Sequence, residues 1–378
     1  MMSELRVRAD LAAVPAYTQG RSVDAATTRT VYKVSSNENP YAPLPSVVAA
    51  VADALAGINR YPESAASDLT ARIAERFGVS AENVVFGAGS VESVSQLMRA
   101  TAGPGDEVLF AWRSFEAYPM LARAAGAEPV QVPLTADHAH DLEAMLDAIT
   151  DRTRLVIVCN PNNPTGTTIG DAGLRSFLDR VPSDVAVLLD EAYVHFNGRA
   201  DSPVGIDYFR AYPNVVIAHT FSKAYGLAGV RVGYAIAPAP LAAAMRKVAV
   251  PFGVTSLAQI SALASLEAEN ELQERVDALV AERERVVAAL GEAGWVLPET
   301  QTNFLWFPLG ESTAAAVEVF EEHGLLVRGF PGEGLRVTIA EPEANDRLLD
   351  VAADLVSHGL AGRLQPDARG WDECRDPR

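Results

Sequence analysis

Short runs of apolar residues recur along the N-terminal and central parts of the chain, and turn-forming residues bound most of them. Several runs are rich in β-branched Val and Ile, and all are shorter than a typical helix. Runs of this kind without polar alternation predict strands that are buried on both faces of a sheet. The predicted strands lie at 84–86, 107–110, 155–159, 185–189, 215–218 and 232–237.

Between these runs, apolar residues return with the period of an amphipathic helix. Leu69, Ile73 and Phe77 show this spacing most clearly. Strands that alternate with helices in this way are typical of an α/β domain. The predicted helices span 46–56 with Ser46 as N-cap, a segment that ends at Gly78, about 90–101, and 272–290.

From about residue 294 the pattern becomes that of a smaller α+β unit. Its predicted strands lie at 302–307, 325–328 and 335–339, and its helices at 314–323 and 342–358. We therefore expect four parts: an arm with part of the small domain at 1–35, a large domain at 36–285, a small domain at 286–361, and a disordered polar tail at 362–378.

Composition restricts the class of protein and of partner. The chain has 378 residues, 49% hydrophobic and 21% charged, as expected of a globular enzyme. Its net charge of −18 disfavours nucleic acid and anionic membranes as partners. Residues 1–10 lack the apolar core of a signal peptide, and no apolar run has membrane-spanning length. Cys159 lies in an apolar run and Cys374 in the polar tail, so no disulfide framework is expected and a cytoplasmic location fits.

The stretch 220–233 carries the most unusual chemistry. It follows the predicted strand at 215–218 and combines Ser222, Lys223, several glycines and Arg231. Side chains just past a strand end lie where α/β sheets place their sites. Ser222 and Arg231 are suited to hold an anion, and an amine beside a phosphate site suggests a lysine that forms a Schiff base with a phosphorylated aldehyde cofactor. The alternative is a surface loop with a solvated lysine.

A second anion site is predicted where the strand at 84–86 leads through Gly87, Gly89 and Ser90 into a helix. Backbone N–H groups at a helix N-terminus attract phosphate. A dinucleotide fingerprint needs a third glycine, but Glu92 stands at that position, so a single phosphate fits the loop better. A plain helix start is the other alternative.

Polar residues end two more predicted strands. Asn163 lies in the segment 160–166, whose two Asn-Pro steps favour turn or extended backbone, and Asp190 follows the run at 185–189. Asp190 is either a helix cap or the partner of a cationic ring nitrogen. The loop at 36–45, with two Asn and three Pro, is either a connector or a substrate-facing loop.

Three aromatic residues, Trp112, Phe115 and Tyr118, follow the predicted strand at 107–110. Aromatic residues at such spacing are usually part of a core, and Tyr118 is expected there. Phe115 or Trp112 is the candidate for stacking on a flat cofactor ring.

Taken together, these motifs resemble the fold-type I pyridoxal-phosphate aminotransferases, and within them the histidinol-phosphate aminotransferase branch. The resemblance covers roughly residues 10–360, and the combination is far more specific than any single motif. Its motifs lie at 36–40, 60–62, 87–90, 160–166, 190–193, 222–223, 231 and 335–338. The segments 112–116, 220–229 and 250–252 narrow it to the actinobacterial aromatic (phenylalanine) amino acid aminotransferases.

The resemblance implies a large domain with a mostly parallel seven-stranded sheet flanked by helices, a smaller α+β domain, and pyridoxal 5′-phosphate as cofactor. Lys223 would bind the cofactor covalently and act as a base, and Asp190 would pair with the ring nitrogen. Asn163 and Tyr193 would hydrogen-bond the ring 3-oxygen. Phe115 would stack on the ring, where histidinol-phosphate enzymes usually have a tyrosine.

The resemblance also implies groups around the phosphate and the substrate. The backbone of Gly89 and Ser90, with Ser222 and Arg231, would bind the phosphate, and Tyr61 of a neighbouring subunit would complete this site, which implies a homodimer. Arg336 would clamp the substrate α-carboxylate. The other expected substrate-binding residues are Asn37, Asn39, Trp112, Phe252 and Arg328.

The implied function is transamination of Phe, Tyr or Trp with 2-oxoglutarate, which gives an aromatic 2-oxo acid and glutamate. The alternative is histidinol-phosphate aminotransferase: a distal phosphate needs cations such as Arg328, whereas an aromatic ring needs apolar walls such as Trp112 and Phe252. A lyase or decarboxylase on the same fold also stays open. A DNA-binding regulator is disfavoured, because the chain has no basic domain and keeps Lys223.

Other constellations predict no further chemistry. His138 and His140 lie in a polar loop without a third ligand, so we interpret them as exposed histidines rather than a metal site. His195 and His219 have no paired Ser or Cys motif, so hydrolysis by a nucleophilic side chain is not supported.

Overall fold

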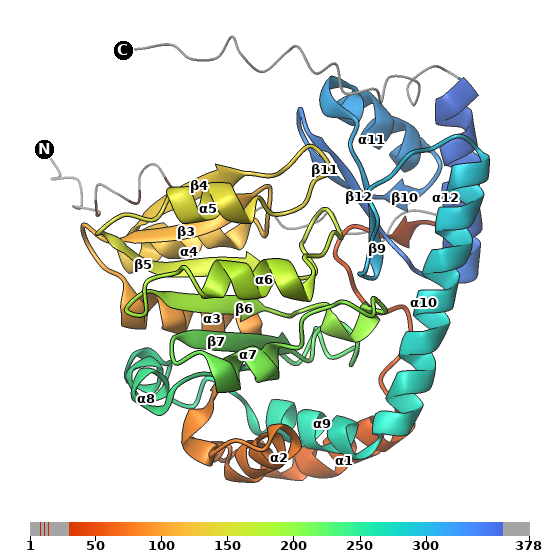
Figure 1. Ribbon diagram of the computed structural model, residues 1–378. Helices are drawn as coiled ribbons and strands as arrows, with labels where there is room; N and C mark the ends of the chain where they lie inside the picture. Colours follow the sequence, from red (N-terminus) through yellow and green to blue (C-terminus); the bar gives the residue numbers. More distant parts are fainter. Residues whose placement is uncertain (1–7, 9–10, 12–13, 15–29, 358–378) are drawn as a thin grey trace, which may run out of the picture.

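The computed structural model describes residues 30–357 together with Arg8, Leu11 and Val14. Within this part, the chain forms a large α/β domain and a smaller α+β domain along one long helix (Figure 1). Of the arm and the part of the small domain expected at 1–35, residues 1–7, 9–10, 12–13 and 15–29 lie outside the described residues, as does the tail expected at 362–378. None of the described helices is both long and apolar enough to cross a membrane.

A seven-stranded sheet forms the centre of the large domain. Its strands are β2 (Val84–Gly87), β3 (Glu107–Trp112), β4 (Glu128–Pro133), β5 (Thr153–Cys159), β6 (Ala186–Asp190), β7 (Val215–Thr220) and β8 (Gly233–Ile236). Their spatial order is β2-β8-β7-β6-β5-β3-β4. Within this sheet only β8 runs in the direction opposite to the other strands, so the prediction of a mostly parallel seven-stranded sheet is confirmed.

Apolar side chains divide between the two faces of this sheet, because successive residues of a strand point in opposite directions. In β5, Leu155 and Ile157 belong to one buried cluster and Val156 and Val158 to the other. The first cluster includes residues of α3 (Ser90–Thr101), α4 (Ala117–Ala125) and α8 (Ala239–Val248), and the second includes residues of α5 (Leu142–Asp147), α6 (Asp171–Leu178) and α7 (Gly205–Ala211). Since helices cover both faces, a ligand reaches the sheet at its strand ends.

The β4 strand was not predicted, and its composition explains why. Of its residues only Val132 is buried, and the strand contains Pro129 and Pro133. Proline cannot donate to a strand ladder and is tolerated at a sheet edge, where β4 lies. The apolar signal that identifies the inner strands is therefore missing here.

The first helices follow their local signals with one exception. α2 (Ser67–Phe77) ends at Gly78, whose φ of 59° is the left-handed conformation that glycine adopts readily. α1 (Pro45–Ala54) packs against α9 (Ser256–Glu267) and begins earlier than predicted. The prediction of Ser46 as its N-cap is wrong, because Leu44 is the N-cap and Pro45, whose φ suits a first turn, opens the helix.

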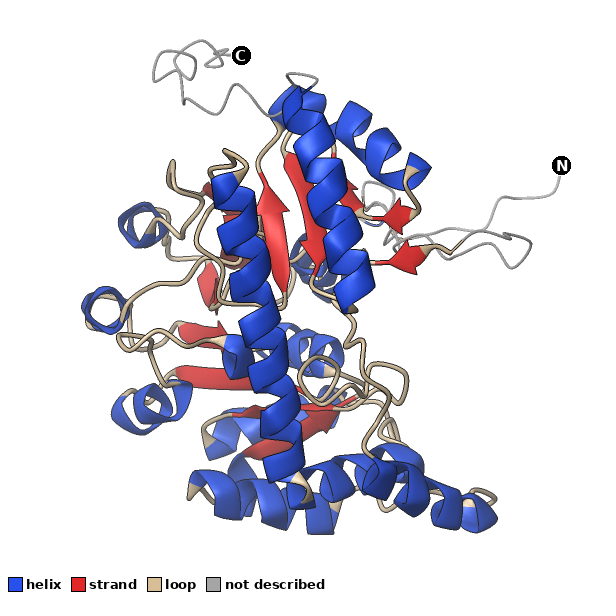
Figure 2. Cartoon of the chain, turned by 90° about the vertical axis from the view of Figure 1, so that its right-hand side faces the viewer, coloured by secondary structure: helices blue, strands red, loops and turns tan. Residues whose placement is uncertain are grey.

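The helix α10 (Glu269–Glu292) runs from the large domain to the small one (Figure 2). Its buried Arg283 donates to the carbonyls of Phe196 at 2.8 Å and Thr302 at 3.1 Å, which ties the helix to both domains. The small domain contains the antiparallel sheet β11 (Arg328–Phe330), β12 (Gly334–Thr338) and β9 (Phe304–Phe307), with α11 (Thr313–Glu322) and α12 (Pro342–Ser357).

The single strand predicted at 325–328 is wrong, because this segment divides between two sheets. β10 (Leu325–Leu326) pairs in parallel with β1 (Tyr32–Lys33), whereas Arg328 begins β11 and pairs with β12. The N-terminal segment after β1 is thereby held against the small sheet, where the N–H of Thr338 donates to the carbonyl of Val34 at 2.9 Å. From there the chain continues into the cavity described next.

Candidate active site

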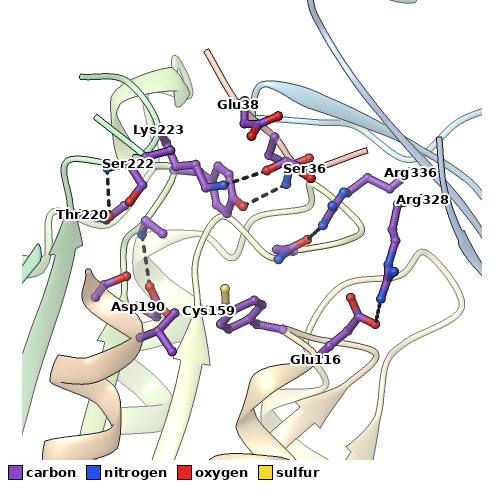
Figure 3. A pocket seen from close by; sticks show the side chains of 18 of the residues that line it. Ser36, Glu38, Glu116, Cys159, Asp190, Thr220, Ser222, Lys223, Arg328 and Arg336 are labelled. Carbon is purple, nitrogen blue, oxygen red and sulfur yellow. Dashed lines mark hydrogen bonds and ion pairs between the residues drawn. The ribbon is translucent and has the colours of Figure 1, made fainter. Parts of the chain in front are cut away.

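A cavity of about 240 Å³ lies between the two domains, at the carboxyl ends of β5, β6 and β7 and the N-terminus of α3 (Figure 3). The apolar runs form the strands, and the polar residues that follow them lie together at this edge of the sheet, as expected for an α/β fold. The cavity brings together most of the site residues predicted from the sequence. Those that line it are Asn37, Ser90, Phe115, Asn163, Asp190, Tyr193, Ser222, Lys223, Arg231, Arg328 and Arg336.

Lys223 follows the carboxyl end of β7, and its half-buried side chain lines the cavity. Its Nζ donates to the carbonyl of Ser36 at 3.1 Å. Burial, followed by the positive charge of Arg336, lowers the pKa of the Lys223 amine to about 7. At neutral pH a substantial fraction of the amine is therefore unprotonated and can act as a nucleophile or a base.

Asn39 supports this lysine through the backbone. Its Nδ2 donates to the carbonyls of Lys223 at 3.3 Å and Ala224 at 2.9 Å. Asn39 was expected to bind substrate, but it is not among the residues that line the cavity. The structure instead places it where it orients the segment that carries Lys223.

Ser90, Ser222 and Arg231 form an anion-binding end of the cavity. Arg231 Nη1 donates to Ser222 Oγ at 3.3 Å, and Nη2 donates to the carbonyl of Ala88 at 3.1 Å. Gly89 has a φ of +83°, and a Cβ there would lie 2.3 Å from Arg231 Nη2, so only glycine permits this approach. Because α3 begins at Ser90, its N-terminus adds a partial positive charge at the same place.

Glu92 explains why this loop differs from a dinucleotide site. Its Oε2 accepts from the N–H of Ala88 at 2.7 Å, and its Oε1 accepts from Gln96 at 3.0 Å. A carboxylate folded back on the loop uses a donor that a second phosphate would need and repels further negative charge. The loop is therefore suited to a single phosphate.

Asp190 ends β6 and is 5% exposed. Its Oδ2 accepts from the hydroxyl of Tyr118 at 2.6 Å, and its Oδ1 accepts from the N–H of Ala192 at 3.2 Å. Burial raises the pKa of the Asp190 carboxyl, whereas these two hydrogen bonds lower it. Tyr118 is buried as predicted, but its hydroxyl also orients Asp190, which no local signal indicated.

A polar wall of the cavity is built from both domains. Asn37 is held by the hydroxyl of Thr338, which accepts from its N–H at 2.9 Å, and its Nδ2 donates to the hydroxyl of Tyr193 at 2.9 Å. Burial raises the pKa of Tyr193, so it stays a phenol that can donate. Asn163 Oδ1 accepts from Arg336 Nη1 at 2.5 Å.

Two arginines reach the cavity from the small domain. Arg336 on β12 donates to the carbonyl of Ser35 at 2.6 Å, and Arg328 on β11 donates to Glu116 Oε1 at 2.6 Å. Figure 3 shows both on the side of the cavity opposite Lys223. Guanidinium groups in this position can hold a carboxylate while the amine acts on a nearby carbon. Glu116 was missed in the sequence, because a lone acid after an aromatic residue has no motif.

Besides Gly89 and Asn39, three more predicted site residues, Tyr61, Trp112 and Phe252, are not among those that line this cavity. Trp112 is half-buried, with the guanidinium carbon of Arg113 4.1 Å from its ring centroid. Phe252 is 45% exposed and stacks on Tyr61, which is 83% exposed, with ring centroids 4.7 Å apart. Tyr61 and Phe252 therefore form an exposed aromatic pair on the surface of the chain.

The interpretation of His140 as exposed is wrong. It is buried, and burial lowers its pKa to about 4, while His138 is half-buried. His219 lies 2.6 Å from Glu191 Oε2 through Nε2 and 2.9 Å from the hydroxyl of Tyr234 through Nδ1. Within the described part of the chain, no group of three His, Cys, Asp or Glu side chains has the geometry of a metal site.

Cys159 is buried, as expected, and also borders the cavity. Burial raises the pKa of its thiol to about 12. The thiol therefore stays protonated near neutral pH and acts as a small apolar wall rather than as a nucleophile.

Comparison with known proteins identifies relatives along nearly the whole chain. The family model described as aminotransferase class I and II matches residues 29–351. The aromatic amino acid aminotransferase of Streptomyces avermitilis is 57% identical over 346 residues, which cover 92% of this chain and 96% of that protein. The aromatic amino acid aminotransferase of Rhodococcus jostii is 51% identical over 356 residues, which cover 94% and 98%.

Solved structures share the fold. A histidinol-phosphate aminotransferase from Sinorhizobium meliloti, in complex with pyridoxal-5′-phosphate, superimposes with a TM-score of 0.85 and 25% identity, covering 94% of this chain and 99% of that one. A mutant aspartate aminotransferase from Thermus thermophilus gives a TM-score of 0.79 with 23% identity, covering 93% and 99%. The fold class expected from the sequence is therefore confirmed.

We predict that Lys223 reacts as a largely neutral amine near pH 7. Protein stripped of bound small molecules is exposed briefly to an amine-acylating reagent over a pH series and analysed by peptide mass spectrometry. Labelling of Lys223 should rise through about pH 7. The exposed Lys247 in the same digest is the internal control. A rise only near the range of unperturbed lysines, about pH 10, would contradict the lowered pKa.

Proposed function

Because the chain belongs to the class I and II aminotransferases, we propose that it transfers the amino group of aromatic amino acids to 2-oxoglutarate, with pyridoxal 5′-phosphate as cofactor. Relatives that are 57% and 51% identical carry the name aromatic amino acid aminotransferase. The observation that carries the proposal is the meeting, in one cavity, of an amine of lowered pKa, an anion-binding end and a buried carboxylate.

The residues of the cavity fit this cofactor. Ser90, Ser222 and Arg231 would hold its phosphate at the end where Gly89 leaves the backbone open. Asp190 would face the ring nitrogen, and the positive charge of the protonated nitrogen would offset the negative charge of the buried carboxylate. When bound, the cofactor supplies an aldehyde carbon for a lysine amine and a ring that draws electrons from the substrate Cα.

Lys223 would move the proton of the substrate Cα. A pKa of about 7 suits a group that takes a proton from the substrate Cα and returns it at neutral pH. Its bond to the carbonyl of Ser36 and the support from Asn39 orient the amine toward the cavity. Tyr193, held by Asn37, would donate a hydrogen bond to the ring 3-oxygen, which keeps the ring in a fixed orientation.

Arg336 would bind the α-carboxylate of the substrate. Its guanidinium is oriented by Asn163 and the carbonyl of Ser35, at 2.5 and 2.6 Å. A carboxylate held there restrains the neighbouring Cα within reach of Lys223, which lowers the entropic cost of proton transfer. Phe115, packed edge-on against Tyr118 with centroids 5.5 Å apart, would offer its ring as an apolar wall.

Histidinol phosphate is the competing amino donor, because one structural neighbour is named histidinol-phosphate aminotransferase. Its distal phosphate would have to displace Glu116 from Arg328 before it could use that cation, whereas an uncharged aromatic side chain needs no such exchange. Arg328 is paired with Glu116 at 2.6 Å. This pairing and the names of the relatives favour a donor with an uncharged aromatic side chain.

We predict that the holoenzyme prefers aromatic donors. With 2-oxoglutarate as acceptor, kcat/KM for Phe, Tyr and Trp should exceed that for histidinol phosphate by about tenfold or more. Lys223→Ala should fold yet lose turnover by roughly 10²–10⁴-fold or more, whereas Lys247→Ala should retain it. A preference for histidinol phosphate would reverse the assignment of the substrate. Turnover without an oxo-acid acceptor would indicate a lyase or decarboxylase instead.

The proposal includes a homodimer, and the exposed aromatic pair supports it. Ile58 and Val250, from the same two segments as Tyr61 and Phe252, are also exposed. Exposed apolar side chains that gather in one place are typical of a contact surface. In a dimer, Tyr61 would reach the phosphate end of the partner's cavity and Phe252 the substrate side.

We predict that Tyr61 acts across the subunit interface. Tyr61→Ala and Lys223→Ala homodimers should each have strongly reduced activity. After the two variants are mixed and their subunits exchanged, about a quarter of wild-type activity should return, since about half of the dimers are mixed and each has one intact site. A mixture that shows only the average of the two variants would mean that Tyr61 serves its own subunit.

A further inference from the structure

Arg328 and Arg336 stand directly opposite each other in the small sheet. β11 and β12 pair antiparallel, and Arg328 is the register partner of Arg336. Both side chains line the cavity, so they leave the same face of the sheet, as Figure 3 shows. Their guanidinium carbons lie 5.7 and 6.0 Å from the ring centroid of Phe330. Like charges that face each other across a sheet repel, so each arginine needs a hydrogen-bonding or charged partner of its own.

The two arginines are compensated in different ways. Arg336 donates to the amide oxygen of Asn163 and the carbonyl of Ser35, which are uncharged. Arg328 donates to the carboxylate of Glu116, which comes from the large domain. The cavity is therefore lined by two cations, and one of them, Arg328, is paired with a carboxylate of the chain itself.

A substrate with one carboxylate and an uncharged ring uses only the first cation. When Arg336 holds the α-carboxylate, Arg328 and Glu116 neutralise each other, and the ring meets no unmatched charge. A dicarboxylate that is held by Arg336 through one carboxylate brings the other toward Arg328, where the Glu116 carboxylate repels it. An exchange of partners on Arg328 keeps the number of ion pairs constant, and the displaced Glu116 side chain, 27% exposed in the pair, returns to water.

We propose that Glu116 is a specificity-determining residue that masks Arg328, and that Arg328 receives the second carboxylate of a dicarboxylic 2-oxo acid when this mask is displaced. The inference rests on the function proposed above, which requires one cavity to accept an aromatic amino acid and a dicarboxylate in turn. Glu116 is the residue before α4 and makes no side-chain cap bond with that helix, so its carboxylate serves Arg328.

A neighbouring ion pair provides a matched control. Arg113 of the large domain binds Glu333 of the small domain, with Nε 2.7 Å from Oε2. This pair joins the segments that also carry Glu116 and Arg328, but neither of its members lines the cavity. Loss of Glu333 therefore weakens the contact between the domains without unmasking Arg328.

The test is a binding titration of the holoenzyme, followed by the visible absorbance of the bound cofactor. Succinate is the non-reacting dicarboxylate, and 3-phenylpropionate is the non-reacting aromatic monocarboxylate. Glu116→Gln should bind succinate about tenfold more tightly and 3-phenylpropionate a few-fold more weakly. Arg328→Gln should weaken succinate about tenfold and 3-phenylpropionate only a few-fold, because Glu116 is then the unmatched charge beside the ring. Glu333→Gln should change both by less than about twofold.

Equal changes in Glu116→Gln and Glu333→Gln would show that the Glu116 pair only holds the domains together. Unchanged succinate binding in either Glu116→Gln or Arg328→Gln would also overturn the inference. The titrations need no turnover, so the two proposals fail in different ways. A wild-type protein that binds neither compound contradicts the proposed function, whereas one that binds both, with constants that no variant alters, contradicts only the role of Glu116.

Discussion

The arrangement of the cavity centres on the Lys223 amine, which is held out of bulk water among charged groups. Burial and the positive charge of Arg336, with a smaller effect from Arg231, all favour the neutral amine. In the proposed function a carboxylate and a phosphate would bind at these arginines, so the groups that would hold the two anions are also groups that favour the neutral amine. Asp190 supplies the opposing charge at another wall, where Tyr118 keeps it oriented despite its burial.

The cavity exists because two domains contribute different chemistry to it. The large sheet delivers Lys223 and Asp190 at its strand ends, and the small sheet delivers Arg328 and Arg336. The segment after β1 joins the two, since Asn37 bonds to Tyr193 of the large domain and to Thr338 of the small one. Within the cavity, the amine and the buried carboxylate thus come from one domain and the two arginines from the other.

Prediction from the sequence was most successful where the signal is local. Lys223, Asp190 and Asn163 each follow an apolar run that forms an inner strand, and all of them line the cavity. It failed where a contact joins distant segments or where a signal is weak. Tyr118 could be placed in the core by its aromatic spacing, but its bond to Asp190 joins helix α4 to the end of β6, and these two elements meet only in the folded domain. The same limit applies to Asn39, which supports backbone that follows much later in the chain.

The amino-acid sequence by itself determined the kind of chemistry, because strand, glycine loop and reactive side chain are adjacent in the chain at 87–90 and 220–233. Only the tertiary structure decided which charges meet. Glu116 and Arg328 are 212 residues apart, and their pairing depends on how the small sheet sits over the large one. Likewise, only folding shows that Tyr61 and Phe252 stack on the surface instead of lining the chain's own cavity, because long-range packing leaves no local pattern to read.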